Sequence, residues 1–186
     1  MLVPLVDAGE EVGVVITQRA SAMRHHSNDW VFPGGALDAS DPSPGAGAVR
    51  EASEELGISA GDFEVLGQLD SRGPIITGFV IDVFVALVDA STPWRPARGE
   101  VREVATVPLR HFVARENSFR AAIDPSHDPG PIVSGRRTDP LRTRELLHFF
   151  IRSGEHLWGL QADILAELLV HLDPKSARYL GEGRLS

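Results

Sequence analysis

Short runs of β-branched and aliphatic residues, separated by turn-forming residues, recur along most of the chain and predict β-strands. The predicted strands are Leu2–Val6, Val12–Thr17, Trp30–Phe32, Glu64–Leu69, Phe79–Leu87, Val101–Val107 and Leu146–Ile151. The polar tetrapeptide Asp7-Ala8-Gly9-Glu10 lies between the first two strands and predicts a hairpin turn. Phe79–Leu87 is mostly apolar at consecutive positions, which is typical of a strand inside a sheet rather than at its edge.

Two other segments predict helices. One helix is expected from about Ala46 to Leu56, because Gly57 follows it in the position where glycine commonly ends a helix. The second is expected over Leu157–Leu172, where apolar residues recur every three or four positions. Strands combined with two helices predict an α+β fold, and specifically an α/β/α sandwich built on a mixed β-sheet.

Residues 113–145 fit neither pattern. This stretch contains four prolines and two glycines among many charged residues, with only a weak apolar cluster over Phe119–Ile123. Long connections without regular structure are uncommon in compact domains and are usually functional loops or disordered segments. We therefore expect residues 113–145 to form an inserted loop.

The composition is that of a globular protein and narrows the class of partner. The chain has 186 residues, of which 42% are apolar and 24% charged, which predicts one domain spanning residues 1–186. Eighteen basic against 26 acidic residues give a net charge of −8, which argues against nonspecific binding to nucleic acid or to an anionic membrane. The chain contains no cysteine, which excludes disulfides and thiolate chemistry.

No segment predicts membrane insertion or export. The longest apolar run, Val83–Val88, is far shorter than the ~20 residues that span a bilayer, and residues 1–9 lack the features of a secretory signal. We expect a cytoplasmic protein without a membrane or nucleic-acid partner. The oligomeric state stays open, a homodimer included.

The candidate chemistry is concentrated in the first predicted helix. Glu51, Glu54 and Glu55 are spaced i, i+3 and i+4 and therefore share one helix face. Like charges at this spacing repel each other, and anions in the last turn of a helix are disfavoured by about 0.3–1 kcal/mol each. A bound divalent cation would offset both the repulsion and the unfavourable helix-end position, because the three carboxylates would then be its ligands. Oxygen ligands without His or Cys favour Mg²⁺ or Mn²⁺, although a solvated acidic face is the alternative explanation.

The spacing around these carboxylates is specific. The chain reads Gly35-x5-Asp41-x8-Arg50-Glu51-x2-Glu54-Glu55-x-Gly57-Ile58. This resembles the Nudix box of the hydrolases that act on nucleoside diphosphates linked to another moiety, and implies the Nudix fold. Two departures stand out: an Asp at position 41 where Glu is usual, and one extra residue before Arg50.

Both departures resemble the coenzyme A pyrophosphatase-like branch of that family. The shared positions are Phe32-Pro33-Gly34-Gly35, Asp38 and Asp41, with Thr17, Arg19, Arg24 and His26 upstream. Ala20 and Asn28 stand where the branch has Ser and Gly. The resemblance implies hydrolysis of a small nucleotide substrate, CoA or acyl-CoA, to 3′,5′-ADP and a phosphopantetheine.

The resemblance also assigns roles to individual residues. Glu51, Glu54 and Glu55 match the metal ligands and catalytic carboxylates of the family. Glu100 is a candidate base or remote metal ligand. Arg50 and Asp41 are expected to hold the metal ligands in their orientation without binding the metal themselves. Arg19, Arg24, Gly34 and Gly35 are candidates for binding the substrate, the arginines through phosphate and the glycines through close backbone approach.

Two alternatives stay open. A Nudix pyrophosphatase could instead act on ADP-ribose, NADH or another compound linked to a nucleoside diphosphate. A non-catalytic Nudix-fold protein could sense such a ligand without turning it over. Non-catalytic relatives typically lose carboxylates of the box, whereas this chain keeps all three glutamates, so an enzyme is favoured.

Overall fold

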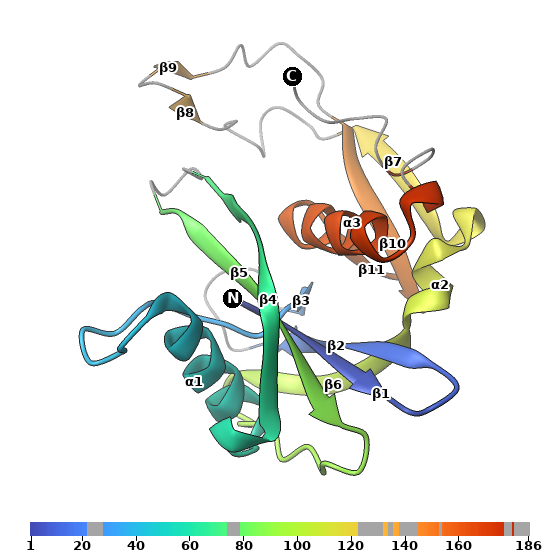
Figure 1. Cartoon of the computed structure of the whole chain (residues 1–186). Helices are drawn as coiled ribbons and strands as arrows, with labels where there is room; N and C mark the ends of the chain where they lie inside the picture. Colours follow the sequence, from blue (N-terminus) through green and yellow to red (C-terminus); the bar gives the residue numbers. More distant parts are fainter. Residues whose placement is uncertain are drawn as a thin grey trace.

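The structure is a computed structural model that describes residues 1–21, 28–73, 79–122, 132–133, 136–137, 145–152, 154–176 and 180. Its largest element is a six-stranded sheet in the order β3-β2-β1-β5-β4, with β6 paired along the other edge of β2 (Figure 1). The strands are β1 (Leu2–Asp7), β2 (Val12–Arg19), β3 (Trp30–Val31), β4 (Phe63–Arg72), β5 (Ile81–Asp89) and β6 (Val101–Pro108).

The strand directions make this sheet mixed, as expected. β1 and β2 pair antiparallel and form the predicted hairpin, whereas β1 and β5 run parallel. β5 lies between β1 and β4, which confirms its predicted place inside the sheet. The strand begins at Ile81 rather than Phe79, and the side chains of Phe79 and Val80 are exposed.

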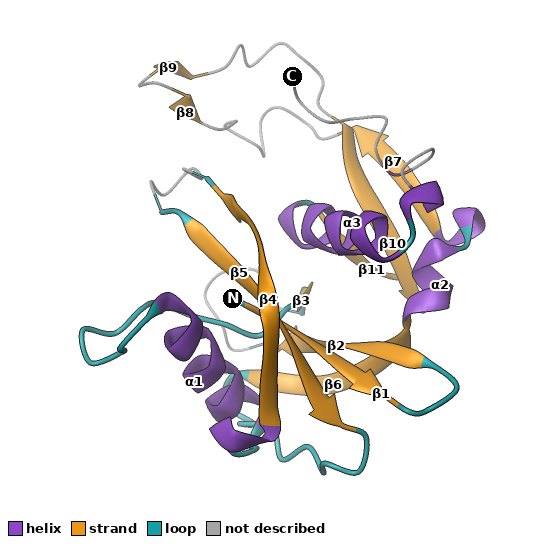
Figure 2. Ribbon diagram, in the orientation of Figure 1, coloured by secondary structure: helices purple, strands orange, loops and turns teal. Residues whose placement is uncertain are grey.

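Helices α1 (Pro44–Leu56) and α3 (Leu160–Leu172) cover opposite faces of the sheet (Figure 2). Alternate residues of β1 divide between the two faces, as the pleat of a strand requires. Leu2 and Val6 pack with Ala48, Ala52 and Leu56 of α1, and Val3 and Leu5 pack with the cluster that includes Ile164 and Leu165 of α3. The predicted α/β/α arrangement is therefore present.

The ends of α1 follow from local residues. Ser43 is its N-cap, and its hydroxyl accepts a hydrogen bond from the Ala46 amide at 3.2 Å, with Pro44 in the first turn. The helix thus begins two residues before the expected Ala46. It ends at Leu56 as predicted, because Gly57 adopts a left-handed backbone with φ 66°.

A second, three-stranded sheet in the order β11-β10-β7 was not expected. It contains β7 (Ser118–Ala122), β10 (Glu145–Arg152) and β11 (Glu155–Trp158). The prediction of β10 over Leu146–Ile151 is confirmed. The helix predicted to begin at Leu157 begins at Leu160 instead, because Leu157 belongs to β11 and points into the core.

The predicted loop over residues 113–145 was wrong at its start. Helix α2 (Leu109–Val113), a 3-10 turn at Arg115–Asn117 and strand β7 occupy residues 109–122. β7 is stabilised by pairing with β10 more than twenty residues later. Further along, β8 (Ile132–Val133) pairs with β9 (Arg136–Arg137), and the rest of residues 123–144 lies outside the described residues.

The remaining elements are short 3-10 turns at Ala60–Asp62 and Pro174–Ser176. Among the described residues, no helix is long and apolar enough to cross a membrane.

Candidate active site

The candidate site lies where the turn after β3 meets helix α1. The Leu2 amide donates a hydrogen bond to the Pro33 carbonyl at 2.9 Å, which fixes this turn against the start of β1. On the helix, Ala48, Ala52 and Leu56 are buried against the sheet. Glu51, Glu54 and Glu55 consequently project from the other side of the helix.

Glu51 and Glu55 turn toward the Gly34–Gly35 backbone. The Gly34 amide donates to Glu55 Oε1 at 3.5 Å, and a Cβ atom placed on Gly35 would overlap the Glu51 carboxylate. Gly34 also has φ 151°, a backbone conformation that side chains rarely allow. Glycine at position 35 therefore lets the main chain approach the Glu51 carboxylate directly, whereas glycine at position 34 is required by its backbone angle and by the closeness of Met1.

The Glu55 carboxyl group is the most perturbed acid of the site. Burial raises its pKa to about 7, and the nearby charges of Glu100 and Glu51 act in the same direction. The Gly34 hydrogen bond and the charge of Arg19 oppose this shift. Arg19, Glu51 and Glu100 therefore all act electrostatically on Glu55, and Glu100 does so from the loop before β6.

Arg50 forms the centre of an ion-pair network behind these carboxylates. Its Nε and Nη2 donate to the two oxygens of Asp41 at 2.9 and 3.1 Å, and its Nη2 also donates to the Ala36 carbonyl. Its Nη1 lies 2.9 Å from Glu51 and 3.3 Å from Glu54. Hydrogen bonding to Arg50 lowers the pKa of Asp41, and the same bonds raise the pKa of Arg50.

The three helix carboxylates therefore have different surroundings. The Glu54 side chain is 62% exposed and the Glu51 side chain 22% exposed. Glu54 points toward solvent and Arg50, whereas Glu55 is buried beside the turn. Asp41 does not cap the helix, because Ser43 does, and its carboxylate instead holds Arg50.

Arg19 lies at the end of β2 on the other side of Glu55. Its Nε atom is buried and has no hydrogen-bond partner within the described structure. The residue lines a small hollow of about 370 Å³ together with Trp30, Val31 and residues at the start of α3. A buried guanidinium donor without an acceptor is suited to an anionic group of a ligand. Arg24, the second predicted phosphate ligand, lies outside the described residues.

The residues present fit a hard divalent cation, with one condition. No three metal-ligating side chains in the described ranges already converge on one point. Glu51 and Glu54 are both held by Arg50, so joint coordination with Glu55 requires that the guanidinium release at least Glu54. The available ligand atoms are carboxylate oxygens, which suit Mg²⁺ or Mn²⁺.

The sequence interpretation missed a further set of side chains beside this site. Phe119, His148, His156 and Trp158 line a larger pocket between the two sheets. The available signal was His148, the one polar side chain in the otherwise apolar run Leu146–Ile151.

Comparisons with known proteins show similarity to one protein family. The family model of the NUDIX domain matches residues 1–127. The uncharacterized Nudix hydrolase NudL of Salmonella paratyphi B is 30% identical over 175 residues, which cover 94% of this chain and 82% of the relative. The relative from Salmonella newport matches to the same extent.

Among solved structures, a C. elegans Ap4A hydrolase binary complex is similar with a TM-score of 0.49 and 15% identity, covering 59% of this chain and 78% of that chain. The family match includes the Gly34–Gly35 turn, the whole of α1 and Glu100, which are the parts that form the candidate site. The chain accordingly belongs to the Nudix hydrolases, enzymes that cleave diphosphate bonds and generally use divalent metal ions.

Proposed function

We propose that this chain hydrolyses the diphosphate bond of CoA or acyl-CoA, with Mg²⁺ or Mn²⁺, giving 3′,5′-ADP and a 4′-phosphopantetheine. The observation that carries the hydrolytic part is the contact between the Gly34–Gly35 backbone and the carboxylates of Glu51 and Glu55. The CoA part rests on the residues Phe32 to Gly35, Asp38 and Asp41 at the spacing of the CoA branch. The protein so proposed is cytoplasmic and acts on a small nucleotide-derived molecule, without a nucleic-acid or membrane partner.

Each residue of the site has a role in this proposal. Glu51, Glu54 and Glu55 would hold the cation, and Arg50, anchored on Asp41, would orient Glu51. When bound, the cation lowers the pKa of the attacking water and polarises the phosphorus–oxygen bond.

The other residues would act on the substrate. Gly34 and Gly35 admit the diphosphate close to the main chain, and Arg19 offers its unpartnered Nε to a phosphate oxygen. Glu100 would take the proton of the attacking water or act as a remote ligand. Water adds to phosphorus, the bond to the bridging oxygen breaks, and that oxygen leaves on the other phosphate.

The test of metal-dependent hydrolysis is the pair Glu54→Gln and Glu55→Gln. Each change removes a charged metal ligand. Loss of a group that only supports a metal ligand lowers activity by up to about 100-fold, so loss of a ligand itself should lower turnover by at least about 100-fold. Turnover is measured by chromatography of the products with Mg²⁺ or Mn²⁺. Glu10→Gln in the exposed β1–β2 turn is the matched control and should stay active. Full activity of either variant, or of the unaltered chain in excess chelator, would overturn the proposal.

The substrate is tested by comparing CoA with dephospho-CoA, ADP-ribose and NADH. If Arg24 binds the 3′-phosphate, Arg24→Ala should raise KM for CoA more than for dephospho-CoA, which lacks that group. Arg19→Ala should weaken both substrates equally, because we place Arg19 at the diphosphate. Equal losses for Arg24→Ala on both substrates would remove it from this role. A preference for ADP-ribose or NADH would contradict the CoA assignment, and binding without turnover would favour a sensor.

A further inference from the structure

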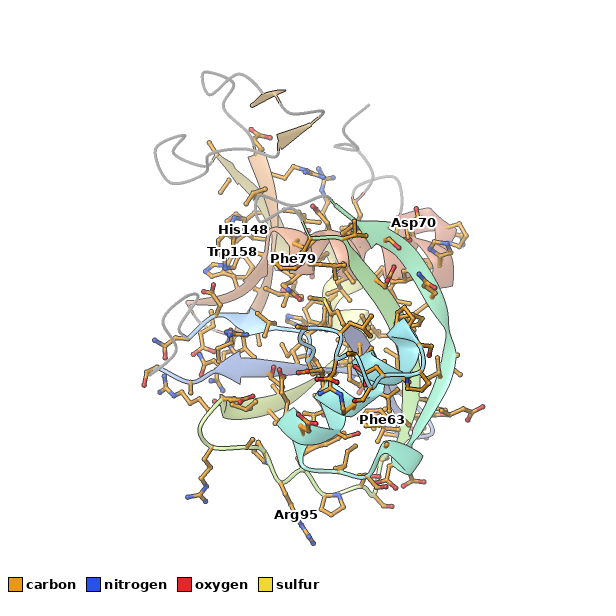
Figure 3. All side chains as sticks on the ribbon, turned by 90° about the vertical axis from the view of Figure 1, so that its left-hand side faces the viewer. Phe63, Asp70, Phe79, Arg95, His148 and Trp158 are labelled. Carbon is orange, nitrogen blue, oxygen red and sulfur yellow. The ribbon has the colours of Figure 1, made fainter. Side chains whose placement is uncertain are left out.

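One face of the small sheet carries a row of aromatic rings. In the strand register, His148 of β10 lies directly opposite both Phe119 of β7 and Trp158 of β11. The Phe119 and His148 rings stack with centroids 4.7 Å apart and an angle of 15° between their planes. The His148 and Trp158 rings are 6.2 Å apart at 12°, and Figure 3 shows these two side chains next to each other.

The opposite face of the same sheet belongs to the core. Leu147, Phe149 and Leu157 alternate with the ring residues and are almost completely buried. Packing in the core therefore explains the apolar residues on one face of the small sheet, but it does not explain the row of rings on the other face. The rings are only half-buried, and they line a pocket.

This pocket, which we call the ring pocket, has a volume of about 770 Å³, within the usual range for small-molecule sites. Phe119, His148, His156 and Trp158 form one wall. The facing wall comes from the central sheet and its neighbouring turns, and includes Gln18, Asn28, Asp29, Trp30 and Arg102. Stacked aromatic surface combined with a few polar groups is typical of a pocket for a planar, polar ring.

The polar groups of the ring pocket also favour a heterocycle over an alkyl chain. The Nδ1 atom of His156 is buried and has no hydrogen-bond partner within the described structure. An imidazole nitrogen can donate or accept, so the edge of a nucleobase would satisfy it. A fatty acyl chain would leave the same atom unpaired at a cost in affinity. Burial lowers the pKa of His148, and so does the proximity of His156, and both effects favour the uncharged form of the ring.

The ring pocket adjoins the proposed catalytic site. It shares Asp29, Trp30 and Trp158 with the smaller hollow that Arg19 lines. Arg19 in turn acts electrostatically on the Glu55 carboxylate. A molecule whose phosphates lie beside Arg19 and Glu55 would therefore extend past Trp30 and Trp158 into the ring pocket.

We propose that the ring pocket binds the purine base of the substrate, against the rings of Phe119, His148 and Trp158. The assignment deepens the proposed function, on which it rests for the position of the diphosphate. It names the nucleotide half of the substrate as the occupant of this pocket. The acyl or pantetheine half of the bound substrate then extends from the catalytic site in another direction.

The test uses two ligands that share ribose and phosphate, namely AMP and ribose 5-phosphate, which lacks the base. Their dissociation constants are measured by calorimetry on the full chain with Mg²⁺, so no turnover is needed. The unaltered protein should bind AMP at least about tenfold more tightly, because stacking of a base on aromatic side chains contributes about that much. Phe119→Leu and Trp158→Leu should each reduce this preference severalfold, since leucine keeps apolar surface and removes the ring.

Phe150→Leu is the matched control. Phe150 packs against Phe119 and His156 but is not among the described residues that line the pocket, so the preference for AMP should remain. An unaltered protein without preference for AMP would overturn the proposal. A preference for AMP over ribose 5-phosphate that survives both Phe119→Leu and Trp158→Leu would also overturn the proposal. This outcome is expected if an alkyl chain fills the pocket.

Failure of the proposed function gives a different pattern. If CoA is not hydrolysed, or Glu55→Gln remains active, the hydrolytic proposal falls, while the AMP preference and its loss in the ring variants still support the purine pocket. If Glu55→Gln abolishes turnover but the ring variants bind both ligands as before, the hydrolase stands and the purine pocket is wrong.

Discussion

Glu51, Glu54 and Glu55 illustrate how far the sequence determines the site at the scale of single residues. Their common helix face follows from the helix period alone, and so does the opposite position of Ala52 and Leu56. Their different surroundings do not. Glu55 is buried because the Gly34–Gly35 turn lies over it, and Glu54 is drawn outward by Arg50, which is itself anchored on Asp41. These contacts depend on how a distant turn docks, which no local pattern encodes.

The buried position of Glu55 predicts a pH-dependent stability. Its pKa is raised from 4.5 in an exposed chain to about 7 in the folded protein. Between these values the folded state binds more protons than the unfolded state, so the free energy of unfolding decreases as the pH rises. Glu55→Gln cannot ionise. In chelator it should match the unaltered protein at pH 5 and exceed it at pH 8, by at most about 3 kcal/mol. Urea unfolding at both pH values measures this difference.

The control for this experiment is Glu54→Gln, one residue away on the same helix. Its side chain is largely exposed, so replacing it should change stability little, and its unfolding curves should follow those of the unaltered protein at both pH values. Adding a divalent cation at pH 8 should then make the unaltered protein more stable than Glu55→Gln, because Glu55→Gln cannot bind the cation through a carboxylate at position 55. Parallel pH dependence in Glu55→Gln and the unaltered protein would show that Glu55 ionises without cost.

At the scale of elements, the sequence predicts those parts whose signals are local. The end of α1 at Gly57, the β1–β2 hairpin and the apolar β5 all depend on neighbouring residues, and the structure contains all three, with β5 inside the sheet as predicted but shifted by two residues. β7 lacks such a signal, because its partner β10 lies beyond residues 123–144. The start of α3 was misplaced for a related reason: Leu157 and Leu160 fit the helix period, but pairing of β11 with β10 decides the structure of Leu157.

The ring row escaped prediction although its strand did not. Leu146–Ile151 is apolar at nearly every position, and such a run indicates a strand buried on both faces. Only His148 departs from the pattern. Its neighbours across the sheet, Phe119 and Trp158, come from strands that the sequence did not reveal. The ring pocket is thus a product of strand pairing and could not be assembled from any one segment.

At the scale of the whole molecule, the two sheets are joined by a polar connection as well as by the core. Arg152 of β10 donates to both oxygens of Glu103 on β6 at 2.8 Å, and its Nε donates to Glu155 of β11 at 2.7 Å. The guanidinium also lies 5.3 Å from the centre of the Trp30 ring, and the Trp30 Nε1 donates to Glu155. Glu155 and Trp30 line the ring pocket, so this network holds its two walls together.

Replacing Arg152 should therefore loosen the small sheet without unfolding the protein. Arg152→Ala leaves Glu103 and Glu155 as neighbouring negative charges without their shared cation, so amide exchange in β11 should become severalfold faster at pH 7. Exchange in β1 and β5 should not change, because those strands lie inside the central sheet. Hydrogen-exchange mass spectrometry measures both regions. Arg110→Ala is the matched control, since the Arg110 side chain is more exposed than that of Arg152 and its ion pair with Glu11 joins no second sheet.

The pH dependence of this effect has a definite sign. Hydrogen bonds from Arg152 lower the pKa of both Glu103 and Glu155, so their stabilising contribution is present above the ordinary carboxyl pKa and is lost as the pH falls through the lowered values. The difference between Arg152→Ala and the unaltered protein should consequently be full at pH 7 and disappear in acid. High salt at pH 7 should also reduce it, because these charges are accessible to screening ions. A difference that persists in acid would mean that Arg152 joins the sheets through its packing on Trp30 rather than through its charge.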